Sequence, residues 1–528
     1  MTDRFTGLPR RAWLQLAATQ AVVASWPAWA TARTVTFEAD PFKLGVASGQ
    51  PSATSVVLWT RLLAANPVRN PWKDQPVAVA WELAEDERFE RVIQRGEAVA
   101  LPELSHSVHV DAEGLPANRV FWSRGRSGEA ISPVGRTRTL PAPGDDVTPL
   151  KVAFASCQRY HSGSFVAYDH MLADAPDLVV FLGDYIYEMG ATQSENRGSW
   201  LNPANKIADY RELYELAKSD PALQRMHAWC PWLIIWDDHE VLNDYAGEPV
   251  RQQGEGGKVA RRMEMGYRTW YEHMPFSMRA LVGGVKGLLD NSKPQQIHGT
   301  YRWGQLANFH MLDTRQYRSV QVGCGVSGLF DPKGCDSLGS PQRQMLGGEQ
   351  SAWLEQQFRA NAVHQPSHVR WNFICQPSVF SKFVIPMLGG KQNHDNWDGY
   401  PEARARLIAA LANHQTANPV ILGGDIHQNW VTHVHRDVDD VGSPVVAPEF
   451  CATSISTPSF GRFTAAEMKA LAPHCLYADR HQRGYLLATV TLQKLTVHVR
   501  HVDLASNVVK TSASFEVVAG RPNIQQVA

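Results

Sequence analysis

The chain has 528 residues, and its 51 Lys and Arg nearly balance its 52 Asp and Glu. That balance argues against a basic surface for nucleic acid or for an anionic membrane, and a hydrophobic content of 44% excludes a largely disordered chain. A domain size of roughly 100–200 residues leaves room for about two to four domains.

The first 32 residues read as a targeting segment. Arg10 and Arg11 precede a mildly apolar run that ends near Ala24, and two A-x-A cleavage patterns follow within 28–32. This arrangement is typical of a twin-arginine export signal, although Pro9 replaces the usual Ser or Thr. We therefore expect recognition by the twin-arginine export machinery and a periplasmic or secreted protein; the alternative is an ordinary amphipathic N-terminal helix.

Residues 36–141 are expected to form a small antiparallel β-sandwich of the immunoglobulin or fibronectin kind, with 140–144 as a linker. Short alternating runs are separated by turn residues, which is the pattern of such sandwiches. The predicted strands are Ser55–Trp59, Val77–Leu83, Ser107–Val110 and Val120–Ser123. The alternative is that this segment is part of the main domain.

From residue 150 to about 520 the pattern predicts a layered α/β domain, because short apolar runs alternate with longer helical stretches. The predicted strands are Val152–Ala155, Leu178–Leu182, Leu233–Trp236, Phe309–Leu312, Trp371–Ile374 and Val420–Leu422. The predicted helices are Ser164–Ala173, Ala208–Leu216, Arg262–Glu272, Gly348–Ala360 and Glu402–Leu411. Consecutive strands near the end, at Val445–Val446, Tyr485–Leu492, Leu495–Val502 and Ser514–Val518, predict a second sheet that faces the first. Outside the leader, no run approaches the roughly 20 apolar residues of a membrane span, so we expect no stable membrane anchor.

Seven cysteines leave an odd thiol. Cys324 and Cys335 bracket a Gly-rich loop and are the best disulfide candidates in an exported protein.

Polar residues that can bind metals follow four of the predicted strands. Cys157 follows the first, Asp184 to Glu188 the second, Asp237 to Asn243 the third, and Asp425 to His427 the last. Ligands of open α/β sheets bind beyond the carboxyl ends of strands, so these groups should meet in one cleft. Asp425 and His427, two residues apart, should project to the same side of an extended backbone. Each strand end alone could be a capping turn or a buried thiol; the four together indicate a site.

The motifs resemble those of the PhoD-type alkaline phosphatase/phosphodiesterase family over most of the chain after the leader. The matching segments are Leu44–Ser52, Ser55–Arg61, Phe154–Gln158, Phe181–Glu188, Trp236–Tyr245, Tyr271–Pro275, Leu312–Arg318, Gly347–Gln350, Asn396–Pro401 and Gly423–His427. The resemblance implies a metallophosphoesterase-type αββα core behind the β-sandwich.

The resemblance also implies a site of the purple-acid-phosphatase kind with one Fe³⁺ and at least one Ca²⁺. It implies that Cys157, Asp184, Tyr187 and His427 hold the iron. Asp184 would also bind the calcium, together with Asn243 and Asp425. Such a mixture is chemically reasonable, because a trivalent ion favours anionic ligands and calcium takes oxygen ligands.

Asp238 is expected to be a further ligand or a close neighbour of one, and His239 to contact phosphate or to orient a ligand. With Asp184, these two residues are our candidate catalytic residues. Arg159, Arg315 and Arg318 could bind phosphate, but a structural role is favoured.

The predicted activity is hydrolysis of phosphate monoesters and diesters through a metal-activated hydroxide. One alternative is a lipid phosphodiesterase of the phospholipase D type, and another is a secreted binding protein with an inactive core. A soluble oxidoreductase is disfavoured because no dinucleotide fingerprint follows a strand.

Overall fold

The computed structural model describes residues 35–527 with several gaps. The gaps are residues 68, 147, 193–194, 196, 198–200, 248–255, 290–294, 323–336, 386–390, 393, 460–466, 468–469 and 471. The predicted export signal and the predicted disulfide pair Cys324 and Cys335 lie outside the described residues. No helix in the described part of the chain combines the length and apolarity needed to cross a bilayer.

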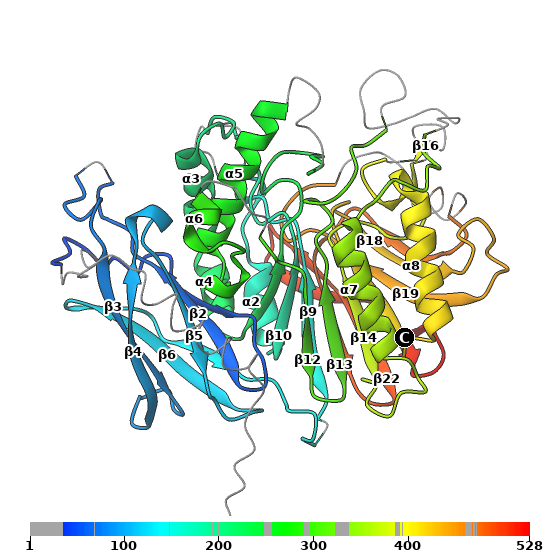
Figure 1. The fold of residues 1–528 in the computed structure, drawn as a ribbon, viewed down its shortest axis with the longest axis horizontal. Coiled ribbons are helices and arrows are strands. Elements are labelled where there is room, and N and C mark those ends of the chain that lie inside the picture. The colour runs from blue at the N-terminus through cyan, green and yellow to red at the C-terminus, as the bar shows by residue number, and fades with distance from the viewer. Residues whose placement is uncertain are drawn as a thin grey trace, which may run out of the picture.

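Two large sheets form the centre of the molecule (Figure 1). The first has ten strands in the order β24 (Ile524–Val527), β23 (Val508–Val518), β22 (Lys494–Asp503), β21 (Arg483–Val490), β9 (Leu150–Ala155), β10 (Leu178–Leu182), β11 (Trp232–Ile235), β1 (Val46–Gly49), β2 (Ser55–Arg61) and β5 (Ser107–Glu113). The second has seven, in the order β12 (Gly299–Trp303), β13 (Ala307–Met311), β14 (Trp371–Cys375), β17 (Pro419–Gly423), β19 (Val445–Cys451), β18 (Asn429–His435) and β20 (Cys475–Asp479). A separate pair joins β15 (Val384–Ile385) and β16 (Lys391–Gln392).

The sheets pack face to face and helices cover their outer faces. Alternation along β14 shows the layering: Phe373 contacts Phe154 of the ten-stranded sheet, whereas Ile374 packs among residues of α7 and α8. The helices of the first sheet are α2 (Ala167–Ala173), α3 (Ile207–Lys218), α4 (Pro221–His227), α5 (Gly256–His273) and α6 (Gly284–Leu289); those of the second are α7 (Gly347–Ala360) and α8 (Pro401–His414). Short 3₁₀ helices lie at Pro102–Leu104, Tyr160–Ser162, Met278–Ala280 and Trp397–Gly399. This arrangement confirms the predicted layered α/β fold.

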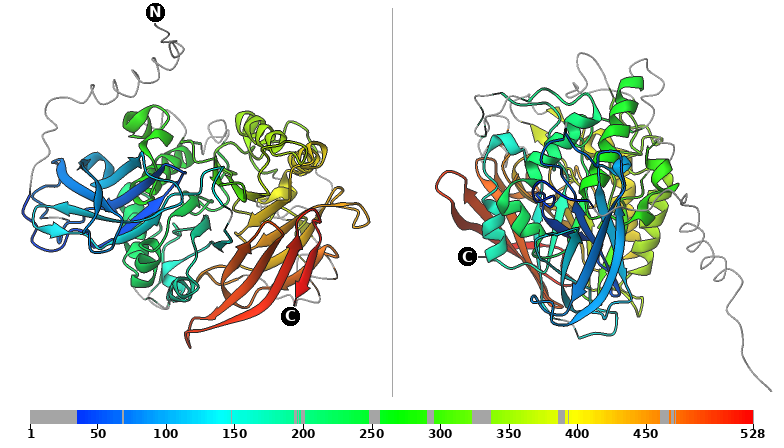
Figure 2. Two further views of the ribbon diagram at one scale, coloured as in Figure 1. Left: turned by 90° about the horizontal axis from the view of Figure 1, so that it is seen from below. Right: turned by 90° about the vertical axis from the view of Figure 1, so that its left-hand side faces the viewer.

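The N-terminal region is a two-layer antiparallel structure that shares a sheet with the core. Its outer layer contains β3 (Val77–Ala84), β4 (Val92–Ala100), β6 (Val120–Ser127), β7 (Ala130–Ile131) and β8 (Gly135–Arg138). This layer packs on β2 and β5, whose strands continue into the core sheet because β1 pairs in parallel with β11 at Gly49 and Trp232. A Cβ at Gly49 would lie 2.5 Å from the carbonyl oxygen of Pro275, so the join requires glycine. Figure 2 shows this region and the C-terminal strands at opposite ends of the molecule.

The predicted strands occur where expected, and Val445–Val446 lies in β19 of the facing sheet as predicted, but the sheet predicted for the last three strands was wrong. Strands β21 to β23 do not form the facing sheet; they extend the first sheet, because β21 pairs antiparallel with β9 through Leu486 and Phe154. The facing sheet is instead built from β12, β13, β14, β17 and the strands that follow β17 up to β20. Among the strands the sequence did not reveal is β4, whose charged, alternating residues are half exposed.

A buried lysine lies where the N-terminal region meets α3. The Lys218 ammonium lies 4.2 Å from the ring centroid of Trp59 and 5.3 Å from that of Tyr185, and it has no hydrogen-bond acceptor among the described residues. Burial lowers the pKa of Lys218 to about 7. The aromatic contacts offset only part of the cost of burying the charge.

Lys218→Met should therefore stabilise the protein at neutral pH. Between about pH 7 and pH 10 the unfolded chain binds a proton at this position that the folded chain does not, so this lysine makes stability rise with pH. The substitution should raise the free energy of unfolding by roughly 2–4 kcal/mol at pH 7 and by much less near pH 10. Denaturant unfolding at both pH values measures this. A variant less stable than the parent at pH 7 would show that the aromatic contacts outweigh the burial cost.

Candidate metal centre

The polar residues predicted at four strand ends meet at one edge of the two sheets. Strands β9, β10 and β11 are parallel neighbours, so their carboxyl ends lie side by side, and β17 brings its own end from the facing sheet. Three overlapping groups of donors define the site, and within each group the candidate ligand atoms lie within 4.8 Å of one another.

The first group combines soft and hard donors. It consists of Cys157, Asp184 and His427. The Tyr187 hydroxyl lies 2.9 Å from Asp184 Oδ2 and 2.9 Å from His427 Nε2, so the phenol belongs to the same place. His427 is oriented by its other ring nitrogen, because Nδ1 lies 3.0 Å from the carbonyl oxygen of Pro458. A thiol, a phenol, an imidazole and a carboxylate thus converge.

The other two groups are dominated by carboxylates. One contains Asp184, Asp238 and His239, and the other contains Asp184, Asp237, Asp238 and Asp425. Asp184 is the member common to all three groups. Its position is therefore what a carboxylate shared by two ions requires. Asp425 is partly exposed, which places it towards the opening of the cluster.

Four of these donors sit on a strained backbone. Cys157 and Asp184 have φ of 58°, Asp425 has 67° and His427 has 55°. The left-handed region costs a non-glycine residue roughly 1–2 kcal/mol, so the surrounding structure must hold it. Asp425 and His427 both reach the cluster, but not through the extended backbone that was predicted. A bend after β17 brings them there.

The clustered carboxylates are unfavourable as anions unless positive charge lies nearby. Burial raises the pKa of Asp184 well above its usual range, and Asp238 and Asp237 raise it further against the pull of His239. Burial likewise raises the pKa of Asp425, with Asp237 and Asp238 adding to it. Burial lowers the pKa of His427 to about 3, which keeps its imidazole in the neutral form that binds metals.

Carboxylate oxygens that lack a hydrogen-bond donor support a metal site here. Asp184 Oδ1, Asp237 Oδ2 and Asp238 Oδ1 are buried without a hydrogen-bond donor among the described residues. Buried carboxylate oxygens are normally paired or bound to a metal. The mixed donor set around Cys157 suits a transition metal, and the oxygen donors around Asp238 suit a hard divalent cation.

His239 is positioned by a residue whose role the sequence did not reveal. Its Nδ1 lies 2.7 Å from Glu188 Oε2, and burial, which lowers the pKa of His239, is outweighed by Asp238, Asp184 and Glu188, which raise it well above normal. The backbone N–H of Asn243 donates to Glu188 Oε1 at 2.9 Å. The Asn243 side chain is exposed, so the structure fixes this predicted ligand through its backbone.

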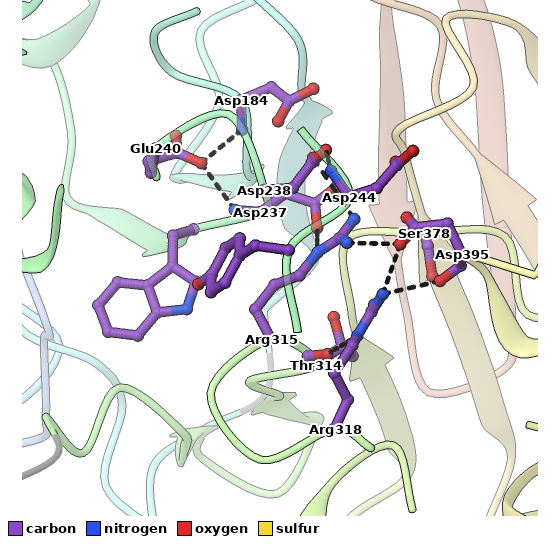
Figure 3. Close-up of polar contacts among 12 residues, drawn as sticks. Asp184, Asp237, Asp238, Glu240, Asp244, Thr314, Arg315, Arg318, Ser378 and Asp395 are labelled. Atoms are coloured by element: carbon purple, nitrogen blue, oxygen red, sulfur yellow. Dashed lines mark hydrogen bonds and ion pairs between the residues drawn. The ribbon is translucent and has the colours of Figure 1, made fainter. Parts of the chain in front are cut away.

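Arg315 contacts both of the neighbouring aspartates, Asp237 and Asp238 (Figure 3). Its buried guanidinium binds Asp237 Oδ1 through Nε and Asp395 Oδ1 through Nη1 at 2.9 Å, and its Nη2 lies 3.4 Å from Asp238 Oδ1. Burial raises the pKa of Asp238, but Arg315 and His239 bring it below its usual range. Each aspartate thus keeps one buried oxygen without a hydrogen-bond donor among the described residues, Oδ2 of Asp237 and Oδ1 of Asp238.

The three arginines considered for phosphate all have structural partners. Arg318 is buried and donates to Asp395 Oδ1 at 2.7 Å, and Arg159 pairs with Glu195 at 2.8 Å. These contacts agree with the favoured structural role. The motif 312–318 also has structural contacts: the Gln350 side chain accepts from the backbone N–H of Asp313 and donates to its carbonyl oxygen.

Comparisons with known proteins find similarities over most of the chain. The model of the PhoD-like phosphatase family matches residues 152–499, and that of its N-terminal domain matches residues 28–141. The chain is 36% identical to alkaline phosphatase D of Bacillus subtilis (strain 168) over 506 residues, which cover 93% of this chain and 83% of the relative. It is 27% identical to purple acid phosphatase 23 of Arabidopsis thaliana over 163 residues, 28% of this chain and 33% of that protein. A solved structure described as "Structure of PhoD" superposes with a TM-score of 0.84 at 35% identity and covers 94% of this chain and 93% of that one.

Proposed function

The chain belongs to the PhoD-like phosphatase family and is a phosphoric ester hydrolase, and we propose that it hydrolyses phosphate monoesters and diesters at the cluster around Asp184. The observation that carries this proposal is the membership of Asp184 in all three donor groups. A carboxylate so placed can bind two ions at once. Two ions side by side are the arrangement that supports in-line displacement at phosphorus.

The donor chemistry supports a mixed site with Fe³⁺ and Ca²⁺. Cys157, Tyr187 and His427, with Asp184, would hold the iron, because a thiolate and a phenolate supply the anionic charge that a trivalent ion needs. Asp184, Asp238 and Asp425, with the Asn243 amide oxygen, would hold the calcium through oxygen donors. When bound, such ions activate a water and neutralise charge on the phosphoryl oxygens.

The chain's own residues then bind and orient the ester. Glu188 holds Nδ1 of His239, which leaves Nε2 as the ring nitrogen available to donate a hydrogen bond to a phosphoryl or leaving-group oxygen. The His239 ring also lies over Tyr187, with the two ring centroids 4.1 Å apart. Arg315 supplies buried positive charge near the cluster. Its guanidinium is held by Asp237 and Asp395, so we do not assign it to phosphate binding.

The type of ester distinguishes the proposal from its alternative. We expect matched monoesters and diesters to be hydrolysed by the metal-loaded protein. A rate on a lysophospholipid that greatly exceeds both would favour the lipid phosphodiesterase. Absence of hydrolysis together with absence of stoichiometric metal would favour the binding protein and overturn the proposal.

Export through the twin-arginine machinery would place this enzyme in the periplasm or outside the cell. The supporting features are Arg10 and Arg11 before an apolar run and the A-x-A patterns after it. That route carries folded proteins, which would let the metal centre load before export.

Asp184→Asn should remove the charge of the shared carboxylate while it preserves the shape. We expect kcat to fall by roughly 100-fold or more and metal content to fall with it, as measured by hydrolysis and elemental analysis. Asp237→Asn should retain more metal, because Arg315 already holds Asp237. Asp398→Asn is the matched control, since Asp398 is buried and paired with Arg404 and belongs to none of the donor groups. Full metal content and a near-normal rate in Asp184→Asn would contradict the shared role.

Colour tests the iron assignment. A phenolate or thiolate bound to Fe³⁺ gives a charge-transfer band in the visible region, which calcium, zinc and magnesium do not give. Purified enzyme should be coloured, Tyr187→Phe should shift or weaken the band and lower activity, and Cys157→Ser should reduce iron retention. Tyr187→Phe nearly preserves volume, so its folding should be unaffected. A colourless, fully active enzyme with divalent ions alone would exclude Fe³⁺ and leave a two-metal hydrolase.

Replacing both Arg10 and Arg11 by Lys should leave folded, uncleaved protein in the cytoplasm, because the export machinery recognises the arginine pair. Cell fractionation and the mass of the purified chain measure this. Normal export of the double variant would exclude the twin-arginine route without affecting the enzymatic proposal.

A further inference from the structure

Glu240 joins the two loops that carry the central aspartates (Figure 3). Its carboxylate is fully buried and accepts three backbone N–H groups. Tyr185 donates to Oε1 at 2.6 Å, and Asp184 and Asp237 donate to Oε2 at 3.2 and 2.7 Å. One side chain therefore binds the backbone that follows β10 and the backbone that follows β11.

These two loops are in direct backbone contact, so small displacements matter. A Cβ at Gly183 would lie 2.5 Å from Cβ of Asp237, and Gly183 itself has φ of 92°. The next residue, Asp184, is also left-handed. An extended or helical backbone at Asp184 would aim its carboxylate elsewhere, so an interaction that fixes its N–H also fixes the direction of the side chain.

Glu240 is not itself one of the metal donors. It belongs to none of the three donor groups, and it forms no ion pair with a cation among the described residues. Its two oxygens are occupied by the three N–H donors. A neutral amide at this position would present an NH₂ group to one of those N–H donors, so the carboxylate is required.

We propose that Glu240 is a positioning residue that sets the distance between Asp184 and the loop bearing Asp238 and His239, and thereby the affinity of the cluster for metal ions. The inference rests on the proposed metal-dependent hydrolysis and assigns Glu240 a role that acts through Asp184. Residues that orient metal ligands typically change metal affinity or activity 10- to 100-fold when substituted, roughly the size of effect expected here.

The chain offers a matched control in Glu449. This residue is also fully buried and accepts the N–H groups of Phe380 and Ser381 at 2.7 and 2.9 Å. It lies on β19 and belongs to none of the donor groups. Glu449→Gln therefore reproduces the loss of a buried carboxylate clamp without touching the loops of the site.

The experiment compares Glu240→Gln and Glu449→Gln with the parent protein in metal retention during dialysis against a chelator, and in kcat and KM. The metal affinity of Glu240→Gln should be lower than that of the parent by about 10-fold or more. Its kcat should fall by a larger factor than its KM rises, and added Fe³⁺ and Ca²⁺ should restore part of kcat. Glu449→Gln should retain metal as the parent does, even if its melting temperature falls.

Equal metal affinity in Glu240→Gln and the parent would overturn the positioning role, as would equal losses in the two variants. A parent that binds no metal and hydrolyses no ester would instead overturn the proposed function. If Glu240→Gln does not fold, amide hydrogen exchange on the folded, metal-free parent gives the test. The amides of Tyr185 and Asp237 should exchange as slowly as those of Phe380 and Ser381, because Glu240 binds them without metal; fast exchange would contradict the proposal.

Discussion

The site depends on one electrostatic constraint: carboxylates crowd together where little water can reach them. Asp184, Asp237 and Asp238 are buried, and Asp425 completes their group at its opening. Such a concentration of like charge is unfavourable unless cations or protons offset it. Arg315 offsets part of it through Asp237, Asp238 and Asp395. The remaining unpaired oxygens define where metal ions would bind.

The fold provides the rigidity that this crowding requires. Parallel strands β9, β10 and β11 place three loops at one edge, and β17 brings a fourth from the facing sheet. The loops then adopt left-handed backbone conformations at four donors, and buried contacts to Glu188, Glu240 and Arg315 hold the cluster together. Strain of this kind persists only where the surrounding structure determines it. Strands β1, β2 and β5 of the N-terminal region belong to the same ten-stranded sheet, so they extend the scaffold that carries the site.

Much of this could be predicted from the sequence because buried parallel strands leave a clear pattern. The run Leu178–Leu182 is apolar throughout, as expected for a strand covered on both faces, and Asp184 follows it directly. The pairing of β21 with β9 could not be predicted, since more than three hundred residues separate them and either sheet could accept the strand. The roles of Glu188 and Glu240 could not be predicted from the sequence either. In the sequence both look like further candidate ligands, and only the backbone N–H groups and the imidazole that they contact show that they position others.

The most direct test of the account is hydrolysis by the metal-free protein after defined ions are added back. The enzyme would be stripped with a chelator, shown to remain folded, and assayed on one monoester and one diester with Fe³⁺ alone, Ca²⁺ alone and both together. We expect negligible activity without metal, little recovery with either ion alone and full recovery with both, because in the proposed site the two ions would share Asp184 but use different donors. Full activity of the metal-free protein would contradict the central claim that the carboxylate cluster works by binding metal ions.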